Sequence, residues 1–165
     1  LRAIEESDGQ ITIIGSGGDI GTQRGMMLSP ALWRRHIKPY SEKLIRTFKD
    51  MGFITFYHSC GSIVPVINDF IEMGLDILDP IQPKAKGMEP ENLKREFGDK
   101  LVFHGGIDVQ ELLPFGTPEE VSRETARLMD ILGSDGGYIV APSHAIQGDT
   151  PPENIMALYD TANGG

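Results

Sequence analysis

The segment His58-Ser59-Cys60-Gly61 carries the residue types in this chain that are best suited to chemistry. It follows an apolar run, residues 53–57, that is typical of a buried strand. Residues i and i+2 of a strand point to the same face, so we expect the His58 imidazole beside the Cys60 thiol. Nitrogen and sulfur ligands together suit a soft divalent metal such as zinc. The pair indicates a metal site, with a structural role or a reactive thiol as the alternatives.

The elements that must position this pair alternate between strand and helix. Ser29-Pro30 and Thr117-Pro118 each begin a helix with an N-cap residue and a proline at the first helical position. Gly52 and Gly74 each end one. The predicted strands cover residues 10–14, 53–58, 75–78, 101–104 and 138–141, and the predicted helices cover residues 30–50, 63–73, 90–97, 117–132 and 150–162.

Near-continuous apolar strands separated by helices predict a parallel sheet buried on both faces, and therefore an α/β fold. Two architectures fit five βα units. One is a self-contained doubly wound sheet, and the other is most of an eight-stranded (β/α)8 barrel with three units missing. Periodicity alone does not choose between them. The glycine-rich loop at residues 15–18 lacks the G-x-G-x-x-G spacing of a dinucleotide-binding loop.

Composition narrows the class of protein. The 165 residues suffice for a single domain, 1–165, and 39% hydrophobic with 24% charged residues is typical of a globular protein. A net charge of −9 argues against a nucleic-acid partner. With no apolar run of membrane length, no visible signal peptide and a single cysteine, we expect a cytoplasmic protein with no membrane partner. The start at Leu1, in what reads as a helix already under way, favours a piece of a longer polypeptide.

Polar residues gather where the predicted strands end, which is where both architectures place function. Each has a plainer alternative: a strand-end histidine often only forms a hydrogen bond, Asp79 precedes a proline as turn formers do, and Asp108 suits a helix cap. The polar residues near these ends are Asp19, Thr22, Gln23, Arg24, His58, Cys60, Asp79, Gln82, Lys84, His104, Asp108, Ser143, His144, Gln147 and Asp149.

A metal held by His58, Cys60 and His144 would have two nitrogen ligands, one sulfur ligand and a free fourth position. That is the form of a catalytic zinc site. Because the ends of parallel strands converge on one rim, the three side chains are expected to meet there.

Seven motifs follow one another along the chain. They are Gly18-Asp19-Ile20-Gly21-Thr22-Gln23, Leu28-Ser29-Pro30, Lys38-Pro39-Tyr40, His58-Ser59-Cys60-Gly61, Phe103-His104-Gly105-Gly106-Ile107-Asp108, Gly136-Gly137-Tyr138-Ile139-Val140-Ala141-Pro142-Ser143-His144 and Asp149-Thr150-Pro151-Pro152-Glu153-Asn154. Together they resemble the uroporphyrinogen decarboxylase superfamily over nearly the whole chain. The resemblance implies a (β/α)8 TIM-type barrel, of which this chain supplies about five βα units from the C-terminal part.

The superfamily has two main branches. Decarboxylases remove carboxylates from the acetate side chains of uroporphyrinogen III, in porphyrin biosynthesis, without metal or cofactor. Corrinoid-dependent methyltransferases move a methyl group between a corrinoid protein and a thiol or other acceptor, and carry His-x-Cys with a later third zinc ligand, usually Cys. His58-Ser59-Cys60 is similar to the start of that motif. His144 stands where those methyltransferases have Cys and where decarboxylases have a substrate-contacting His, so the chain resembles both branches.

The resemblance favours a zinc-dependent methyltransferase, with a corrinoid as methyl carrier. The expected partners are a small-molecule or tetrapyrrole substrate and a corrinoid protein, and a homodimer is allowed. The runner-up is a cofactor-free decarboxylase, and a third reading is a corrinoid- or tetrapyrrole-binding protein without catalysis. We also expect these 165 residues to be inactive alone, because an arc of a barrel exposes two sheet edges. The implied roles are zinc binding by His58, Cys60 and His144, catalysis by His144 and Asp19, and substrate binding by Gln23, Asp79, His104 and Asp108.

Overall fold

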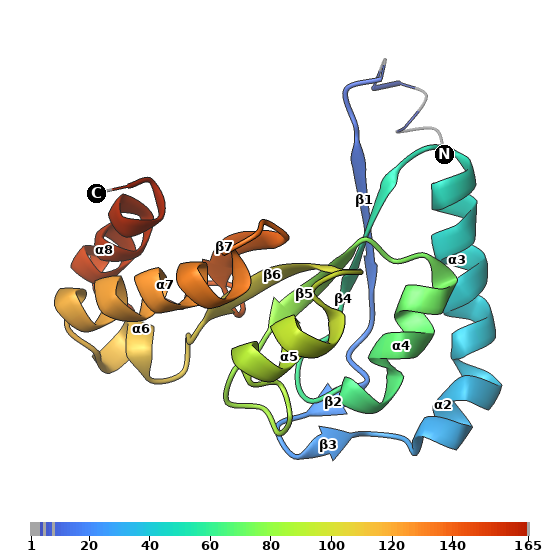
Figure 1. Ribbon diagram of the computed structural model, residues 1–165, viewed down its shortest axis with the longest axis horizontal. Helices are drawn as coiled ribbons and strands as arrows, with labels where there is room; N and C mark the ends of the chain where they lie inside the picture. Colours follow the sequence, from blue (N-terminus) through green and yellow to red (C-terminus); the bar gives the residue numbers. More distant parts are fainter. Residues whose placement is uncertain (1–3, 5, 8, 165) are drawn as a thin grey trace.

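A computed structural model describes residue 4, residues 6–7 and residues 9–164 of the chain (Figure 1). Its main feature is one sheet of five parallel strands whose order in space repeats their order in the chain. A short antiparallel pair, β2 (Gly21–Thr22) and β3 (Gly25–Met26), follows the first strand. The strands of the sheet are β1 (Ile13–Gly17), β4 (Ile54–His58), β5 (Ile77–Ile81), β6 (Val102–Ile107) and β7 (Tyr138–Pro142).

Helices connect the strands, and α4, α5 and α7 lie on the same side of the sheet in Figure 1. A doubly wound sheet would reverse its strand order and carry helices on both faces. Chain-ordered parallel strands with helices on one side form an arc of a (β/α)8-type barrel, which confirms the expected architecture. The helices are α2 (Pro30–His36), α3 (Lys38–Asp50), α4 (Val64–Met73), α5 (Pro90–Phe97), α6 (Leu112–Phe115), α7 (Pro118–Leu132) and α8 (Pro152–Ala162).

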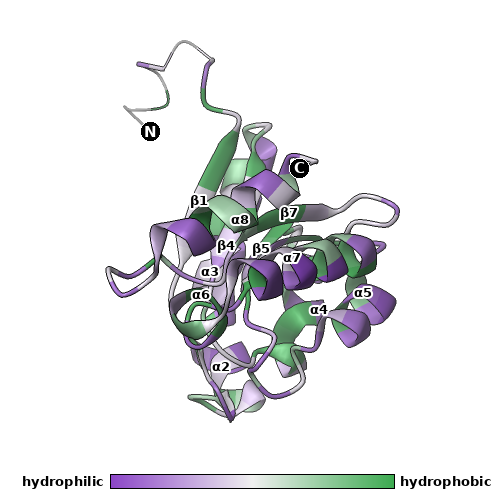
Figure 2. Ribbon diagram, turned by 90° about the vertical axis from the view of Figure 1, so that its left-hand side faces the viewer, coloured by the Kyte–Doolittle hydropathy of each residue, from purple (hydrophilic) through white to green (hydrophobic). Residues whose placement is uncertain are grey.

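The two faces of the sheet differ in burial. On β4, Thr55 and Tyr57 are buried, whereas the alternating residue Ile54 keeps 45% of its surface exposed. Ile13 pairs with Ile54 in register and is 46% exposed. Figure 2 shows hydrophobic colour at the start of β1, hydrophilic colour on the outer helix α5, and both colours on α7. The core therefore lies between the sheet and its helices, and the opposite, inner face of the arc is open. Ile139 on β7 is 39% exposed.

Ion pairs join three of the helices. Arg34 on α2 and Lys38 on α3 both form ion pairs with Asp69 on α4, at 2.8 and 2.7 Å. Burial alone would raise the pKa of the Asp69 carboxyl, but its hydrogen bonds to Arg34 and Lys38 outweigh burial and lower that pKa below its usual value. The pairs hold the first two helices against α4.

The element boundaries correct the sequence prediction in several places. The first strand begins at Ile13, three residues later than predicted. The helix predicted over residues 30–50 is interrupted at Ile37, because Pro39 has no N–H to donate and its ring excludes a continuous helix there. The β2–β3 pair was not predicted, whereas α6 follows Asp108, where the sequence allowed a helix cap. The prediction of a helix under way at Leu1 lies outside the described residues.

The two capped helix starts predicted at Ser29 and Thr117 are confirmed, whereas the last helix begins at Pro152 without a side-chain cap from Thr150. The Ser29 hydroxyl accepts a hydrogen bond from the Leu32 N–H, and Thr117 and Glu120 form a reciprocal capping box at the start of α7. Among the residues described, no helix combines the length and apolarity needed to cross a membrane.

Candidate metal centre

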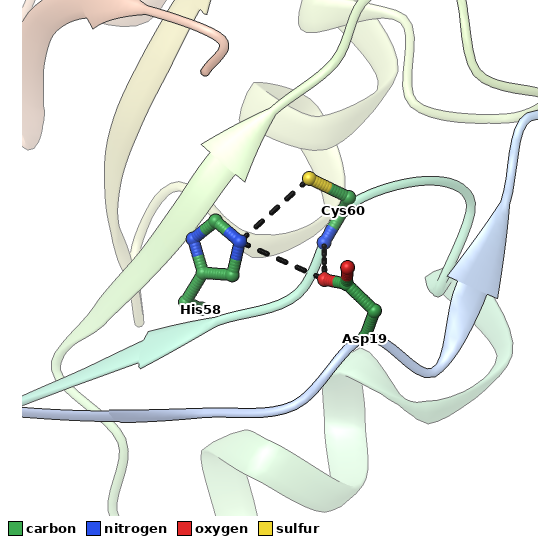
Figure 3. A group of neighbouring side chains, drawn as sticks. All are labelled: Asp19, His58 and Cys60. Carbon is green, nitrogen blue, oxygen red and sulfur yellow. Dashed lines mark hydrogen bonds and ion pairs between the residues drawn. The ribbon is translucent and has the colours of Figure 1, made fainter. Parts of the chain in front are cut away.

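Three side chains that could bind a metal converge where β4 ends (Figure 3). His58 is the last residue of β4, Cys60 follows two residues later, and Asp19 lies in the loop after β1. His58 Nε2 lies 3.7 Å from Cys60 Sγ and 3.6 Å from Asp19 Oδ1. One ligand atom from each residue lies within 4.8 Å of the other two, and the described part of the chain contains no second group of this kind. The predicted His58–Cys60 neighbourhood is confirmed.

Glycines allow the backbone to bring these side chains together. Gly61 has a φ of 81°, in the left-handed region that favours glycine, and a Cβ there would lie 2.6 Å from the carbonyl carbon of Gly21. Gly17 pairs with His58 in register, and a Cβ there would lie 2.7 Å from the His58 Cβ. The loop after β1 can therefore lie directly against the His58–Gly61 segment. Asp19 Oδ1 accepts a hydrogen bond from the Cys60 N–H at 2.9 Å, which fixes the carboxylate beside the thiol.

Asp79, on β5, holds the His58 ring from its other side. His58 and Asp79 are paired in register, and Asp79 Oδ2 lies 2.5 Å from His58 Nδ1. The other carboxylate oxygen, Oδ1, lies 2.5 Å from His104 Nδ1 on β6. An ionised carboxylate only accepts hydrogen bonds, so each Nδ1 donates and carries the proton. In the neutral ring this places the lone pair on His58 Nε2, which is directed at Cys60 and Asp19, the arrangement found behind metal-binding histidines.

The local charges favour a cation. Burial alone would raise the pKa of Asp79, but hydrogen bonds from His104 and His58 outweigh burial and lower that pKa below its usual value. Burial, followed by the negative charges of Asp19 and Asp79, raises the pKa of the Cys60 thiol. Cys60 is therefore a protonated, weakly nucleophilic thiol at neutral pH, which argues against the reactive-thiol reading. A divalent cation would compensate both carboxylates and favour the thiolate.

A hollow of about 480 Å³ lies next to the group on the inner face of the arc. Asp79 and three histidines reach it, and the remaining wall is mostly apolar. The lining residues are His58, Asp79, Pro80, His104, Ala141, Pro142, His144, Ala145, Ile146 and Tyr159.

The structure places Asp19, and not His144, beside the His58–Cys60 pair. The preceding residue, Ser143, is buried and donates from Oγ to the Ile81 carbonyl at 2.8 Å, which fixes the end of β7. His144 starts the exposed loop that follows. It faces the same hollow as His58 but lies outside the group of three potential ligands.

Gln23 supports the candidate metal centre through a chain of hydrogen bonds. Its Nε2 donates to Gln82 Oε1 at 2.9 Å, and the same oxygen accepts from the Gly61 N–H at 2.8 Å. Gln23 and Gln82 thus tie the loop after β1 to the His58–Gly61 segment.

Asp108 has the geometry of the helix cap that the sequence allowed, and its role in substrate binding stays a prediction. It accepts hydrogen bonds from the backbone N–H groups of residues 110–112 and pairs with Lys84 at 2.9 Å. Its carboxylate is occupied in capping the turn before α6, and it does not line the hollow beside His58. The helix-cap alternative applies here.

The sequence predicted that Asp79 orients substrate or the residues around the metal ligands, and that His104 binds substrate. It did not predict that one carboxylate would hold both histidines. The available signal was position: His58, Asp79 and His104 lie on three consecutive strands of a parallel sheet. Adjacent strands are about 4.8 Å apart, so a central carboxylate can reach an imidazole on either side.

The sequence model of the uroporphyrinogen decarboxylase (URO-D) family matches residues 7–164. A uroporphyrinogen decarboxylase from Syntrophotalea carbinolica is 29% identical over 142 residues, covering 82% of this chain and 38% of the relative. One from Thermus thermophilus is 29% identical over 137 residues, covering 81% of this chain and 37% of the relative.

Among solved structures, a methyltransferase from Methanosarcina mazei matches with a TM-score of 0.73 at 21% identity. The match covers 95% of this chain and 43% of that one, and it supports the fold. The chain spans less than half the length of these relatives. Since the family's sequence pattern extends over nearly all of its residues, the chain belongs to the uroporphyrinogen decarboxylase family.

Proposed function

We propose that this chain provides the metal and acceptor site of a zinc-dependent methyltransferase, which transfers a methyl group from a corrinoid to a thiol. The observation that supports it is the group of Asp19, His58 and Cys60 at the end of β4, with Asp79 behind the His58 ring. Family membership supports an enzyme, because the matching relatives are named uroporphyrinogen decarboxylase and a solved structure with a similar fold is named a methyltransferase.

Two separations between the donor atoms are close to those around a tetrahedral zinc ion. With Zn–N near 2.0 Å and Zn–S near 2.3 Å, tetrahedral angles separate the nitrogen and sulfur atoms by about 3.5 Å. The observed separation of His58 Nε2 and Cys60 Sγ is 3.7 Å, and that of His58 Nε2 and Asp19 Oδ1 is 3.6 Å. The donor set of one nitrogen, one sulfur and one oxygen leaves the fourth tetrahedral position for a substrate.

In this proposal His58, Cys60 and Asp19 bind the metal, and Asp79 keeps His58 in the metal-binding tautomer. When bound, zinc lowers the pKa of a coordinated thiol and makes the thiolate available at neutral pH. The hollow beside His58 admits the acceptor. Part of its wall, which includes Ile146, is apolar.

A decarboxylase is the second candidate, and His144 favours it. This exposed histidine faces the hollow and not the metal group, so it is free to hydrogen-bond a substrate carboxylate. The curated relatives that match are named uroporphyrinogen decarboxylase. In that case Cys60 is incidental, and activity requires no metal.

Metal analysis of the whole protein, including any residues beyond these 165, separates the candidates. We expect stoichiometric zinc in the wild type and its loss in His58→Ala and Cys60→Ser. His36→Ala, on the exposed surface of α2, is the matched control and should retain zinc. The zinc-loaded protein should transfer methyl groups from methylcobalamin to 2-mercaptoethanol. A zinc-free wild type that decarboxylates uroporphyrinogen would refute the proposal, and tetrapyrrole binding without turnover of either substrate would indicate a binding protein.

A further inference from the structure

His104 is held as firmly as His58, yet the metal site does not need it. It lies on the inner face of β6, with 27% of its side chain exposed. Its Nδ1 donates to Asp79 Oδ1 at 2.5 Å, and its ring packs edge-on against Phe56, with centroids 5.3 Å apart at 69°. These contacts fix both the position and the rotation of the ring. His104 is not one of the three residues grouped around the metal position.

The carboxylate decides which nitrogen of His104 is available. Because Asp79 accepts from Nδ1, the neutral ring has its lone pair on Nε2. His104 lines the same hollow as His58 and His144, and this part of the structure contains no hydrogen bond to its Nε2. An imidazole whose far nitrogen is bound to an ionised carboxylate can accept a proton at Nε2, since the carboxylate stabilises the resulting imidazolium.

We propose that His104 takes the proton of the acceptor thiol. This rests on the proposed function, because it concerns the thiol bound at the metal site. The S–H bond breaks and its proton moves to His104 Nε2. A sulfur lone pair then forms the new bond to the methyl carbon, the methyl–cobalt bond breaks, and its electron pair stays on the corrinoid. The proton passes from His104 to water when the methylated product leaves. The other titratable groups that line this hollow are Asp79, His58, His144 and Tyr159.

Two substitutions of His104 distinguish a role in proton transfer from a role in holding Asp79 in place. In His104→Asn the amide nitrogen takes the place of Nδ1, so the donor to Asp79 is kept while Nε2 is lost. In His104→Gln an amide group takes the place of Nε2, and the donor to Asp79 is lost. If His104 only supports Asp79, asparagine should preserve its function and glutamine should not. If His104 accepts the proton, neither substitution should preserve its function.

The test counts protons when 2-mercaptoethanol binds to the zinc-loaded whole protein. Calorimetry at about pH 8, in buffers of different ionisation enthalpy, measures the protons released. We expect the wild type to release almost no proton, because His104 retains it. His104→Asn should release about one proton per thiol bound, since the thiol still binds as the thiolate. It should keep its zinc and transfer methyl groups about 100-fold more slowly.

Equal proton release by the wild type and His104→Asn would overturn the inference and leave the proposed function standing. So would zinc loss in His104→Asn, because His104 would then position the metal. A wild type that binds no zinc overturns the proposed function, and this inference with it.

Discussion

Replacing Asp79 with asparagine tests the centre of the site with an almost isosteric change. The Asp79 carboxylate accepts one hydrogen bond from His58 Nδ1 and one from His104 Nδ1, each at 2.5 Å. An asparagine side chain offers one oxygen and one NH₂ group in the same place. It can accept from one ring, but its NH₂ group faces the N–H of the other. That second ring must turn away or move its proton to Nε2, the atom with which His58 would bind zinc.

The expected loss of zinc affinity follows from this geometry. Asp79 is 10% exposed at its side chain, so water cannot readily replace the lost acceptor. Loss of a carboxylate behind a metal-binding histidine weakens metal affinity about 10–100-fold. This corresponds to about 1.4–2.7 kcal/mol of zinc-binding free energy. We expect the Asp79→Asn protein to fall within this range.

The assay is a zinc titration of the whole protein in competition with a chromophoric chelator, with circular dichroism to confirm folding. Asp99→Asn is the matched control: it makes the same change in charge at a side chain that is 72% exposed in the turn between α5 and β6. The control should bind zinc like the wild type. A zinc affinity of Asp79→Asn within twofold of the wild type would show that Asp79 does not orient His58, and the reasoning would be wrong.

Three further predictions concern the thiol, the ion pairs and the loop. In the metal-free protein, burial and two nearby carboxylates raise the Cys60 pKa, so alkylation by iodoacetamide should have its pH midpoint above that of glutathione; a lower midpoint would contradict the electrostatics described. Asp69→Asn should lower the free energy of unfolding by about 1–3 kcal/mol at about pH 7. Because the folded-state pKa of Asp69 is depressed, that stabilisation is present above about pH 4 and is lost as the pH falls through the folded pKa. In urea unfolding, the difference in stability between the wild type and Asp69→Asn should therefore be smaller at about pH 3 than at about pH 7. Gly61→Ala should cost more than about 2 kcal/mol in urea unfolding, because the new Cβ would meet backbone 2.6 Å away at a positive φ. Gly148→Ala, with no atom within 4 Å of its Cβ, is the control, and equal losses in the two variants would rule out the clash.

Much of the fold could be predicted from the sequence because its signals are local. Proline, threonine and glycine mark helix ends through single hydrogen bonds and dihedral angles, and α5 has the bounds that the sequence predicted. The β2–β3 pair escaped prediction because two-residue strands have no periodicity. The interruption at Ile37 escaped because its cause, Pro39, lies two residues later, where proline is also tolerated in the first turn of a helix.

The candidate site was predictable where it depends on a single strand. His58 and Cys60 are two residues apart, so strand geometry alone brings them to one face. Whether Asp19 or His144 joins them depends on the path of two loops from opposite edges of the arc, β1 and β7. Sequence spacing does not determine that path. The path is determined by contacts such as that of Gly61 with Gly21 and the hydrogen bond that fixes Ser143.

The open inner face of the sheet carries both exposed isoleucines and the histidines of the candidate metal centre. Ile54 shares this face with His58 on β4, and Ile139 pairs in register with His104. Any surface that covers these isoleucines also shields the two histidines from water. Burying one such side chain fully is worth about 1.5–3 kcal/mol, and part of this is available here because Ile54 and Ile139 are only 45% and 39% exposed. The same event lowers the local dielectric constant, which strengthens the hydrogen bonds of Asp79 and the attraction of the carboxylates for a cation.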